Sequence, residues 1–318
     1  MTFPHPHRAS KGAIRLPTEA VERAQARLAG YVKRALVPHL STQRPLFEAC
    51  PMTTGPPHLC DRVGWHWSML GDGEFDVSVR DDGVEVWVTQ MGDYMNMNTA
   101  FVDREAGVVA IVDPFDAKVW VNALAEEGLS PTHLLYTHTH RDHTAGFSMM
   151  LKLVPEVEVW GHEEAMVPNL LGHFIFKKVD FTHTWDSEPN STVQWAAGAI
   201  TLHVTHSPGH APGHVTFHGH GVYHAGDLLF TAHSGRVDLP GSDPLAQWHS
   251  VLYARSLLRG LPGDWRLIPG HRYEWIDGST PDWISVKQAL AHNFSLNSPE
   301  LESFESLPWQ RFDDDISA

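Results

Sequence analysis

The stretch THTHRDHTAG, residues 137–146, places four side chains that can bind metal within six positions. These side chains are His138, His140, Asp142 and His143. The stretch directly follows Leu134-Leu135-Tyr136, an apolar run typical of the end of a buried strand. If the chain turns after this strand, the first two imidazoles can face one point while Asp142 and His143 face another. The pattern therefore predicts one short loop that serves two metal ions.

Three later segments present further ligand types at the ends of expected strands. SPGHAPGH at 207–214 is a tight Gly- and Pro-rich loop in which His210 lies, whereas His214 begins the next strand. HAGD ends in Asp227, a candidate bridging ligand, and IPGH ends in His271. Imidazole and carboxylate groups suit zinc, iron or manganese, and the lack of nearby cysteine argues against a thiolate zinc site. We therefore expect His210, Asp227 and His271 to complete the metal centre.

The composition is that of a protein with a full-sized core and a small-molecule substrate. The chain has 318 residues and a formal charge of −15, which disfavours nucleic acid or anionic membrane as a partner. No apolar run is long enough for a membrane span or a signal peptide, so we expect a cytoplasmic protein. Cys50 and Cys60 are expected to be free thiols. The basic first 40 residues and the acidic end are expected to be solvated, with docking of one terminus on the other, within the chain or across a homodimer, as the alternative.

The chain divides into an N-terminal extension, 1–83, and a catalytic domain, 84–318. The extension is expected to hold an amphipathic helix between Thr18 and Pro38 and then an irregular segment. In the domain we expect strands at 84–88, 99–102, 108–112, 132–136, 157–160, 200–205, 214–217, 222–224 and 266–268, and helices at 117–127, 245–258 and 283–292. Hairpins followed by strands that alternate with helices predict an α/β fold with two mixed sheets and outer helices.

These motifs together resemble the metallo-β-lactamase superfamily, and within it the glyoxalase II-like thioester hydrolases. The resemblance covers about residues 84–292 and is supported by SGRVDLPGSDP at 234–244. It implies an αββα sandwich with the site at one edge. It also implies that His138, His140 and His210 hold one metal, that Asp142, His143 and His271 hold the other, and that Asp227 bridges the two.

The activity that the resemblance implies is hydrolysis of a thioester by a hydroxide that bridges two divalent ions, with zinc first and iron or manganese as alternatives. Asp142 would be both a ligand and the group that orients the nucleophile. A mononuclear iron persulfide dioxygenase, which needs only His138, His210 and Asp227, is the runner-up. A lactone or ester hydrolase and a non-enzymatic metal-binding protein are further alternatives. Only 47 residues follow His271, which is short for the glutathione-binding helical domain of classical glyoxalase II.

Several residues beside the motifs have two interpretations. Arg272 and Tyr273 follow the last ligand and are either substrate contacts or surface residues. Arg236 and Asp238 are expected to pair in a turn or to lie near the site. The remaining histidines of interest are expected to orient ligands or to be satisfied in the core; they are His162, His203, His206, His214 and His224.

Overall fold

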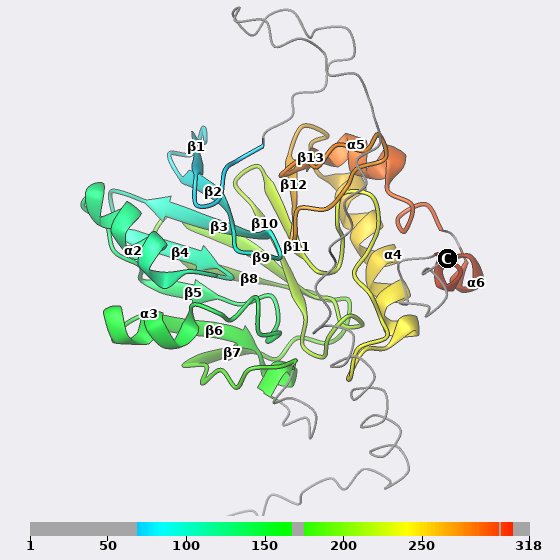
Figure 1. Ribbon diagram of the computed structural model, residues 1–318, viewed down its shortest axis with the longest axis horizontal. Coiled ribbons are helices and arrows are strands. Elements are labelled where there is room, and N and C mark those ends of the chain that lie inside the picture. The colour runs from blue at the N-terminus through cyan, green and yellow to red at the C-terminus, as the bar shows by residue number, and fades with distance from the viewer. Residues whose placement is uncertain (1–68, 167–174, 299, 308–318) are drawn as a thin grey trace, which may run out of the picture. The chain divides into compact units, whose positions relative to one another are not determined.

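The first of two β-sheets has seven strands that follow one another in chain order (Figure 1). In the computed structural model, which describes residues 69–166, 175–298 and 300–307, the first four strands are antiparallel and the last four run parallel. The strands are β1 (Phe75–Val79), β2 (Glu85–Met91), β3 (Asn96–Asp103), β4 (Val108–Val112), β5 (His133–Leu135), β6 (Glu158–His162) and β7 (His183–Trp185). Because β2 and β3 are buried along their whole length, both faces of this sheet must be covered.

The second sheet has six strands in the order β13-β12-β11-β10-β9-β8. Only β11 and β12 pair in parallel, so this sheet is also mixed. Its strands are β8 (Thr192–Ala197), β9 (Ile200–His206), β10 (Val215–Gly219), β11 (Val222–Gly226), β12 (Arg266–Pro269) and β13 (Ile284–Ser285). Phe101 of the first sheet and Phe217 of this one are fully buried in the core between the two sheets.

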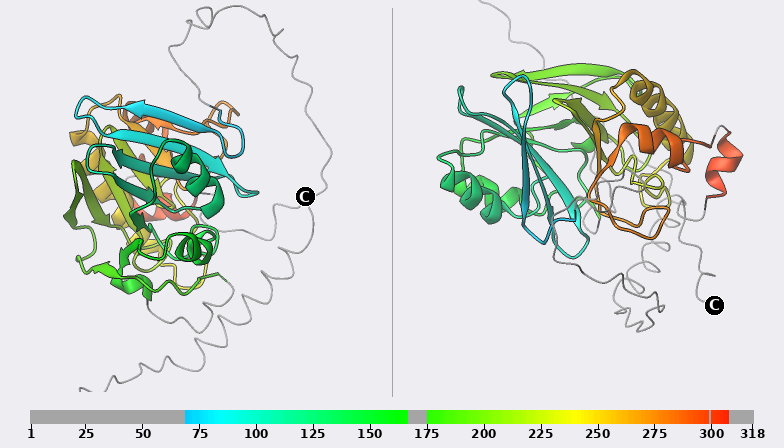
Figure 2. Two further views of the ribbon diagram at one scale, coloured as in Figure 1. Left: turned by 90° about the vertical axis from the view of Figure 1, so that its left-hand side faces the viewer. Right: turned by 90° about the horizontal axis from the view of Figure 1, so that it is seen from above.

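Helices cover the outer faces of both sheets, as Figures 1 and 2 show. The helices are α2 (Ala117–Glu126) and α3 (Phe147–Leu153) on the first sheet, and α4 (Pro244–Gly260), α5 (Val286–His292) and α6 (Leu301–Glu305) on the second. A short 3-10 turn, η1 (Glu163–Met166), follows β6. Asp116 and Asp243 cap α2 and α4 by accepting hydrogen bonds from the first free N–H groups of each helix. The αββα sandwich expected from the sequence is therefore confirmed.

The structure differs from the sequence prediction at several elements. The hairpin partner β1 lies in the range assigned to the extension, and β7, β8 and β13 were not expected because they are short or lie at a sheet edge. The helix expected at 283–292 begins only at Val286, because Ile284–Ser285 pairs with β12 and Ser285 forms a capping box with Gln288. The expected N-terminal helix and both cysteines lie outside the described residues. Among the described helices, none has the length and apolar character needed to cross a membrane.

Candidate metal centre

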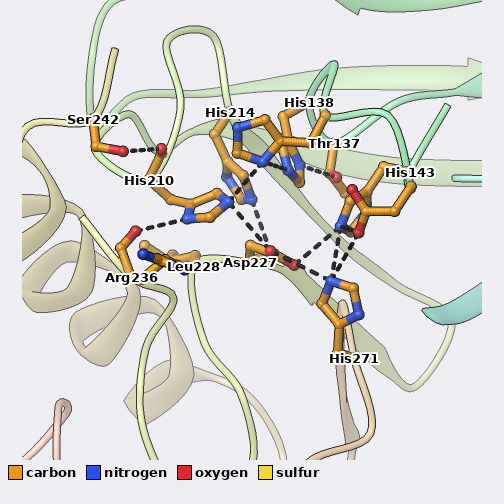
Figure 3. A network of polar contacts seen from close by, with 12 residues as sticks. Thr137, His138, His143, His210, His214, Asp227, Leu228, Arg236, Ser242 and His271 are labelled. Carbon is orange, nitrogen blue, oxygen red and sulfur yellow. Dashed lines mark hydrogen bonds and ion pairs between the residues drawn. The ribbon is translucent and has the colours of Figure 1, made fainter. Parts of the chain in front are cut away.

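The loops that carry the predicted ligands meet at one edge of the sandwich, where strands of both sheets end. The loop 137–146 follows β5 of the first sheet, while Asp227 and His271 follow the parallel neighbours β11 and β12 of the second. The carboxyl ends of parallel strands lie at the same edge of a sheet, which brings these two side chains together. His210 lies in the loop between β9 and β10. Figure 3 shows His138, His143, His210 and His271 arranged around Asp227.

Three buried imidazoles form the first cluster. Nδ1 of His140 lies 2.9 Å from Nε2 of His138 and 3.0 Å from Nε2 of His210. His210 donates its Nδ1–H to the carbonyl oxygen of Arg236 at 2.8 Å, so its Nε2 carries a lone pair when the ring is neutral. The Thr137 hydroxyl donates to Asp113 and therefore accepts from Nδ1 of His138, which leaves a lone pair on Nε2 there as well. The lone pairs of His138 and His210 thus point toward the same position, as the lone pairs of ligands around a cation do.

The second cluster consists of Asp142, His143 and His271. Nε2 of His271 lies 3.2 Å from Oδ2 of Asp142 and 3.3 Å from Nε2 of His143. The remote nitrogens of both imidazoles have fixed partners, because Nδ1 of His271 donates to the Tyr94 carbonyl at 2.8 Å and Nδ1 of His143 contacts Oδ2 of Asp113 at 2.9 Å. Hydrogen bonds of this kind orient imidazole ligands and increase their basicity.

The Asp227 carboxylate lies between the two clusters. Its Oδ1 is 3.2 Å from Nε2 of His143, and its Oδ2 is 3.2 Å from Nε2 of His210 and 3.6 Å from Nε2 of His271. The Asp227 backbone N–H donates to Nε2 of His214 at 3.1 Å. A Cβ at Gly270 would lie 2.1 Å from Oδ1, so only glycine leaves room for the carboxylate in this position.

The charges show what this centre is built to hold. Burial lowers the pKa of His138 well below its ordinary value, with further lowering from His143 and His140. Burial also opposes charge on His143, but Asp227, Asp142 and Asp113 outweigh it and raise the pKa to about 10. The pKa of Asp227 lies well below its ordinary value despite burial, because His271, His143 and His210 surround it.

The buried Asp227 carboxylate and the half-buried Asp142 carboxylate therefore attract positive charge to the space between the imidazoles. Without metal, protons on His143 and His271 supply that charge. The same nitrogen and oxygen donors suit divalent metal ions, and they fall into two groups of potential ligands, one of His138, His140, His210 and Asp227 and one of Asp142, His143 and His271. The donor set thus fits two ions.

Two supporting residues were not expected from the sequence. Asp113, at the end of β4, accepts hydrogen bonds from the Thr137 N–H at 2.8 Å and the Thr137 hydroxyl at 2.6 Å, and also contacts His143. Its φ of 48° is unusual for a residue other than glycine and indicates a conformation held by these contacts. Asn96 donates from Nδ2 to Oδ2 of Asp142 at 3.1 Å. The signal for Asp113 was its position at the end of a buried strand that pairs in parallel with the strand before the metal loop.

Comparison with known proteins places this arrangement in a family. Residues 96–271 match the profile described as the Metallo-beta-lactamase superfamily. The chain belongs to this superfamily. A hydroxyacylglutathione hydrolase of Aeromonas salmonicida (strain A449) is 30% identical over 214 residues, which are 66% of this chain and 76% of the relative. These matches make the chain a glyoxalase II-like member of the superfamily and an enzyme, a metal-dependent hydrolase.

Solved structures of the superfamily support the fold. The crystal structure of BLEG-1 B3 metallo-beta-lactamase is similar with a TM-score of 0.54 and 24% identity, over 66% of this chain and 99% of that one. ETHE1 from Myxococcus xanthus gives a TM-score of 0.50 and 20% identity, over 73% of this chain and 88% of that one. At these identities the similarity supports a shared fold and nothing more specific.

The two candidate substrate contacts of this superfamily member lie in different surroundings. The Arg272 guanidinium donates from Nη1 to the Leu70 carbonyl at 2.7 Å and to Oδ1 of the buried Asp282 at 3.1 Å, so it ties together three separate segments of the chain. Tyr273 instead stacks on His271, with ring centroids 5.4 Å apart and planes at 13°, and packs edge-on against Phe230. Tyr273 therefore borders the second cluster.

The remaining predictions concern the loop at 234–241 and five histidines. Arg236 and Asp238 form the expected ion pair, and a Cβ at Gly235 would lie 2.1 Å from the Asp227 carbonyl, so this loop also packs against the centre. His214 contacts Asp227, and Nδ1 of His224 contacts the Thr99 hydroxyl at 3.0 Å, while His203 is exposed and stacks on His218. His162 and His206 stack on each other away from these ligands, with centroids 3.7 Å apart.

Proposed function

We propose that this enzyme hydrolyses thioesters at two divalent metal ions, with zinc as the first choice. The observation that carries the proposal is Asp227, whose two oxygens face two separate clusters that each hold three further ligands. The curated relatives are named hydroxyacylglutathione hydrolase, and an acyl thioester of that kind is the substrate class that we propose here.

The proposed ligand assignment follows the distances between donor atoms. One ion is held by His138, His140 and His210, and the other by Asp142, His143 and His271. Asp227 bridges them, with Oδ2 toward the first cluster and Oδ1 toward the second, which agrees with the contacts of 3.2 Å to His210 and to His143.

The chain's own groups then position the reactants. Divalent ions at such a site supply a water nucleophile near neutral pH and polarise the carbonyl under attack. Oδ2 of Asp142 is engaged by Asn96 and His271, so Oδ1 is the atom available to accept a hydrogen bond from the attacking water. A leaving thiol with a pKa of about 8.5 departs readily as thiolate, so no protein acid is required beside it.

Tyr273 is the proposed substrate contact. Burial raises the pKa of its phenol above the ordinary value, so the hydroxyl stays protonated at neutral pH and can donate a hydrogen bond to an acyl oxygen or a substrate carboxylate. Phe230, which packs edge-on against this ring, forms an apolar wall beside the second cluster. We do not propose Arg272 as a contact, because its Nη1 donates to both Asp282 and the Leu70 carbonyl and these two bonds hold the guanidinium in place.

The test is metal analysis of protein purified without added metal, followed by assays with thioesters, lactones, esters and a persulfide while oxygen uptake is recorded. We expect at least two ions per chain and thioester hydrolysis. One iron per chain with oxygen consumption on a persulfide would show that the dioxygenase alternative is correct. Asp227→Asn should lower both metal content and turnover, whereas the matched variant Asp116→Asn, at the N-cap of α2, should leave both unchanged.

A further inference from the structure

A third group of potential metal ligands lies outside the centre described above. It consists of His162 at the end of β6, Glu164 in η1 and His206 at the end of β9, and their donor atoms lie within 4.8 Å of one another. Both histidines are buried, whereas the side chain of Glu164 is 48% exposed and gives access from solvent.

One carbonyl group fixes the protonation of both imidazoles. The Ser187 carbonyl oxygen lies 3.0 Å from Nε2 of His162 and 2.9 Å from Nδ1 of His206. A carbonyl can only accept, so both of these nitrogens carry the hydrogen. The lone pairs of the neutral rings therefore lie on Nδ1 of His162 and Nε2 of His206. Metal-binding histidines are held in the same way, with the second ring nitrogen donating to a backbone carbonyl.

The lone pair on Nε2 of His206 receives no hydrogen bond from the part of the chain that the structure describes. Its Nε2 is buried without a hydrogen-bond partner among the described residues, and burial, with a contribution from His162, lowers the pKa of the ring to about 4. Leaving a buried hydrogen-bond acceptor without a donor destabilises the folded protein, and a bound metal ion would remove this cost at Nε2 of His206. On His162, Nδ1 accepts a single hydrogen bond from the described residues, from the Glu164 backbone N–H at 3.3 Å, which is longer than the usual range.

The spacing of His206 and Glu164 fits a metal ion better than a hydrogen bond. Nε2 of His206 and Oε2 of Glu164 are 3.8 Å apart, too far for a hydrogen bond. Two ligands that each lie about 2.1 Å from zinc at a tetrahedral angle are about 3.4 Å apart. Two imidazoles and one carboxylate would leave the fourth position to water, a ligand set that zinc accepts.

The 3-10 turn η1 touches both loops of the metal centre. The Thr139 hydroxyl, between His138 and His140, donates to the Ala165 carbonyl at 3.3 Å. A Cβ at Gly213, in the loop of His210, would lie 2.3 Å from the Ala165 nitrogen. We propose that His162, Glu164 and His206 bind a further zinc ion, which braces η1 against the two loops at the metal centre.

The experiment counts zinc in the full-length protein after dialysis against a series of buffered free Zn²⁺ concentrations. Wild-type protein should bind one zinc per chain more than Glu164→Gln, in which the affinity for this ion falls at least about tenfold. Glu163→Gln, the matched change at the preceding residue, should behave as wild type. Thermal unfolding gives a second readout. At a free Zn²⁺ concentration that just fills the site of His162, Glu164 and His206 in the wild type, this zinc ion should raise the Tm of wild type and Glu163→Gln but not of Glu164→Gln.

Two results would overturn the proposal. One is a wild-type protein that binds no more zinc than Glu164→Gln at any concentration, and the other is a third zinc that Glu164→Gln retains with unchanged affinity. His206→Gln should lose the same ion, but because His206 is buried, the exposed Glu164 gives the decisive variant. Asp227→Asn reports on the two ions at Asp227, whereas Glu164→Gln reports on the further zinc ion. A failure of the dinuclear assignment can therefore be told apart from a failure of the further zinc site.

Discussion

Gly270→Ala tests how tightly the chain positions the carboxylate between the two clusters. The new Cβ would lie 2.1 Å from Oδ1 of Asp227 and 2.9 Å from the carbonyl carbon of Gly226. Relief of the first contact requires a shift of about 1 Å, since non-bonded heavy atoms rarely approach closer than about 3.0–3.5 Å. Oδ1 now lies 3.2 Å from His143, and metal–ligand distances tolerate only about 0.2 Å. A misplacement of about 1 Å can reduce catalysis about 100-fold, or about 2.7 kcal/mol in the activation free energy.

The assay is kcat/KM on the thioester substrate together with metal content after dialysis. We expect Gly270→Ala to lose about 100-fold in kcat/KM and part of its metal while its circular dichroism stays native. Gly260→Ala is the matched control, because Gly260 ends α4 and its new methyl group would meet nothing within 4 Å. It should keep full activity and gain up to about 1 kcal/mol in stability. If Gly270→Ala binds two ions with wild-type affinity and activity, the inference that Asp227 bridges the clusters is wrong.

Three further predictions concern the orientation of His143 by Asp113, the pH dependence of stability through His224, and the core residue Phe101. Asp113→Asn should weaken metal affinity about 10–100-fold in equilibrium dialysis, because the carboxylate that orients His143 is lost; unchanged affinity would show that this contact does not orient the ligand. Burial lowers the pKa of the His224 imidazole to about 4, so as the pH falls this residue takes up a proton in the unfolded chain before it does so in the folded chain. The free energy of unfolding therefore decreases as the pH drops below about 6.5. Between pH 7.5 and 5.5 this residue should cost the metal-free protein roughly 1.3 kcal/mol in urea unfolding, a loss that His224→Gln should lack; an equal loss in the variant would contradict the assignment. Phe101→Ala, in the core between the sheets, should lower the free energy of unfolding by about 3–5 kcal/mol, and a cost below about 1 kcal/mol would mean that the site collapses around the cavity.

The ligand-bearing loops could be predicted from the sequence because each follows a strand with a strong local signal. Val108–Val112 is an uninterrupted apolar run, and the expected strand matches β4 residue for residue. The IPGH turn likewise ends a short apolar strand and places His271 two residues after the last residue of β12. At such positions local sequence and tertiary structure favour the same conformation.

The supporting residues could not be predicted, because their roles depend on contacts between distant segments. Asp113 and His143 are 30 residues apart and meet only because β4 and β5 run parallel. The same holds for Asn96, which reaches Asp142 across 46 residues. Arg272 had two interpretations, as a substrate contact or as a surface residue, and its bond to Leu70 could not be foreseen because Leu70 lies in a segment for which the sequence predicted no regular structure. Sequence spacing thus predicted the candidate ligands that the fold brings together, while pairing between strands decided what surrounds them.

The distribution of the ligands over two sheets has a consequence for metal selectivity. Backbone hydrogen bonds of 2.8 Å join the sheets at this edge, from the Val215 N–H to the Thr137 carbonyl and from the Met97 N–H to the Gly270 carbonyl. Elsewhere, side chains such as Phe101 and Phe217 set the separation of the sheets. A larger or smaller side chain in this core would change the spacing between donors that come from opposite sheets. The radius of the ion that fits best is therefore adjustable by substitutions that touch no ligand.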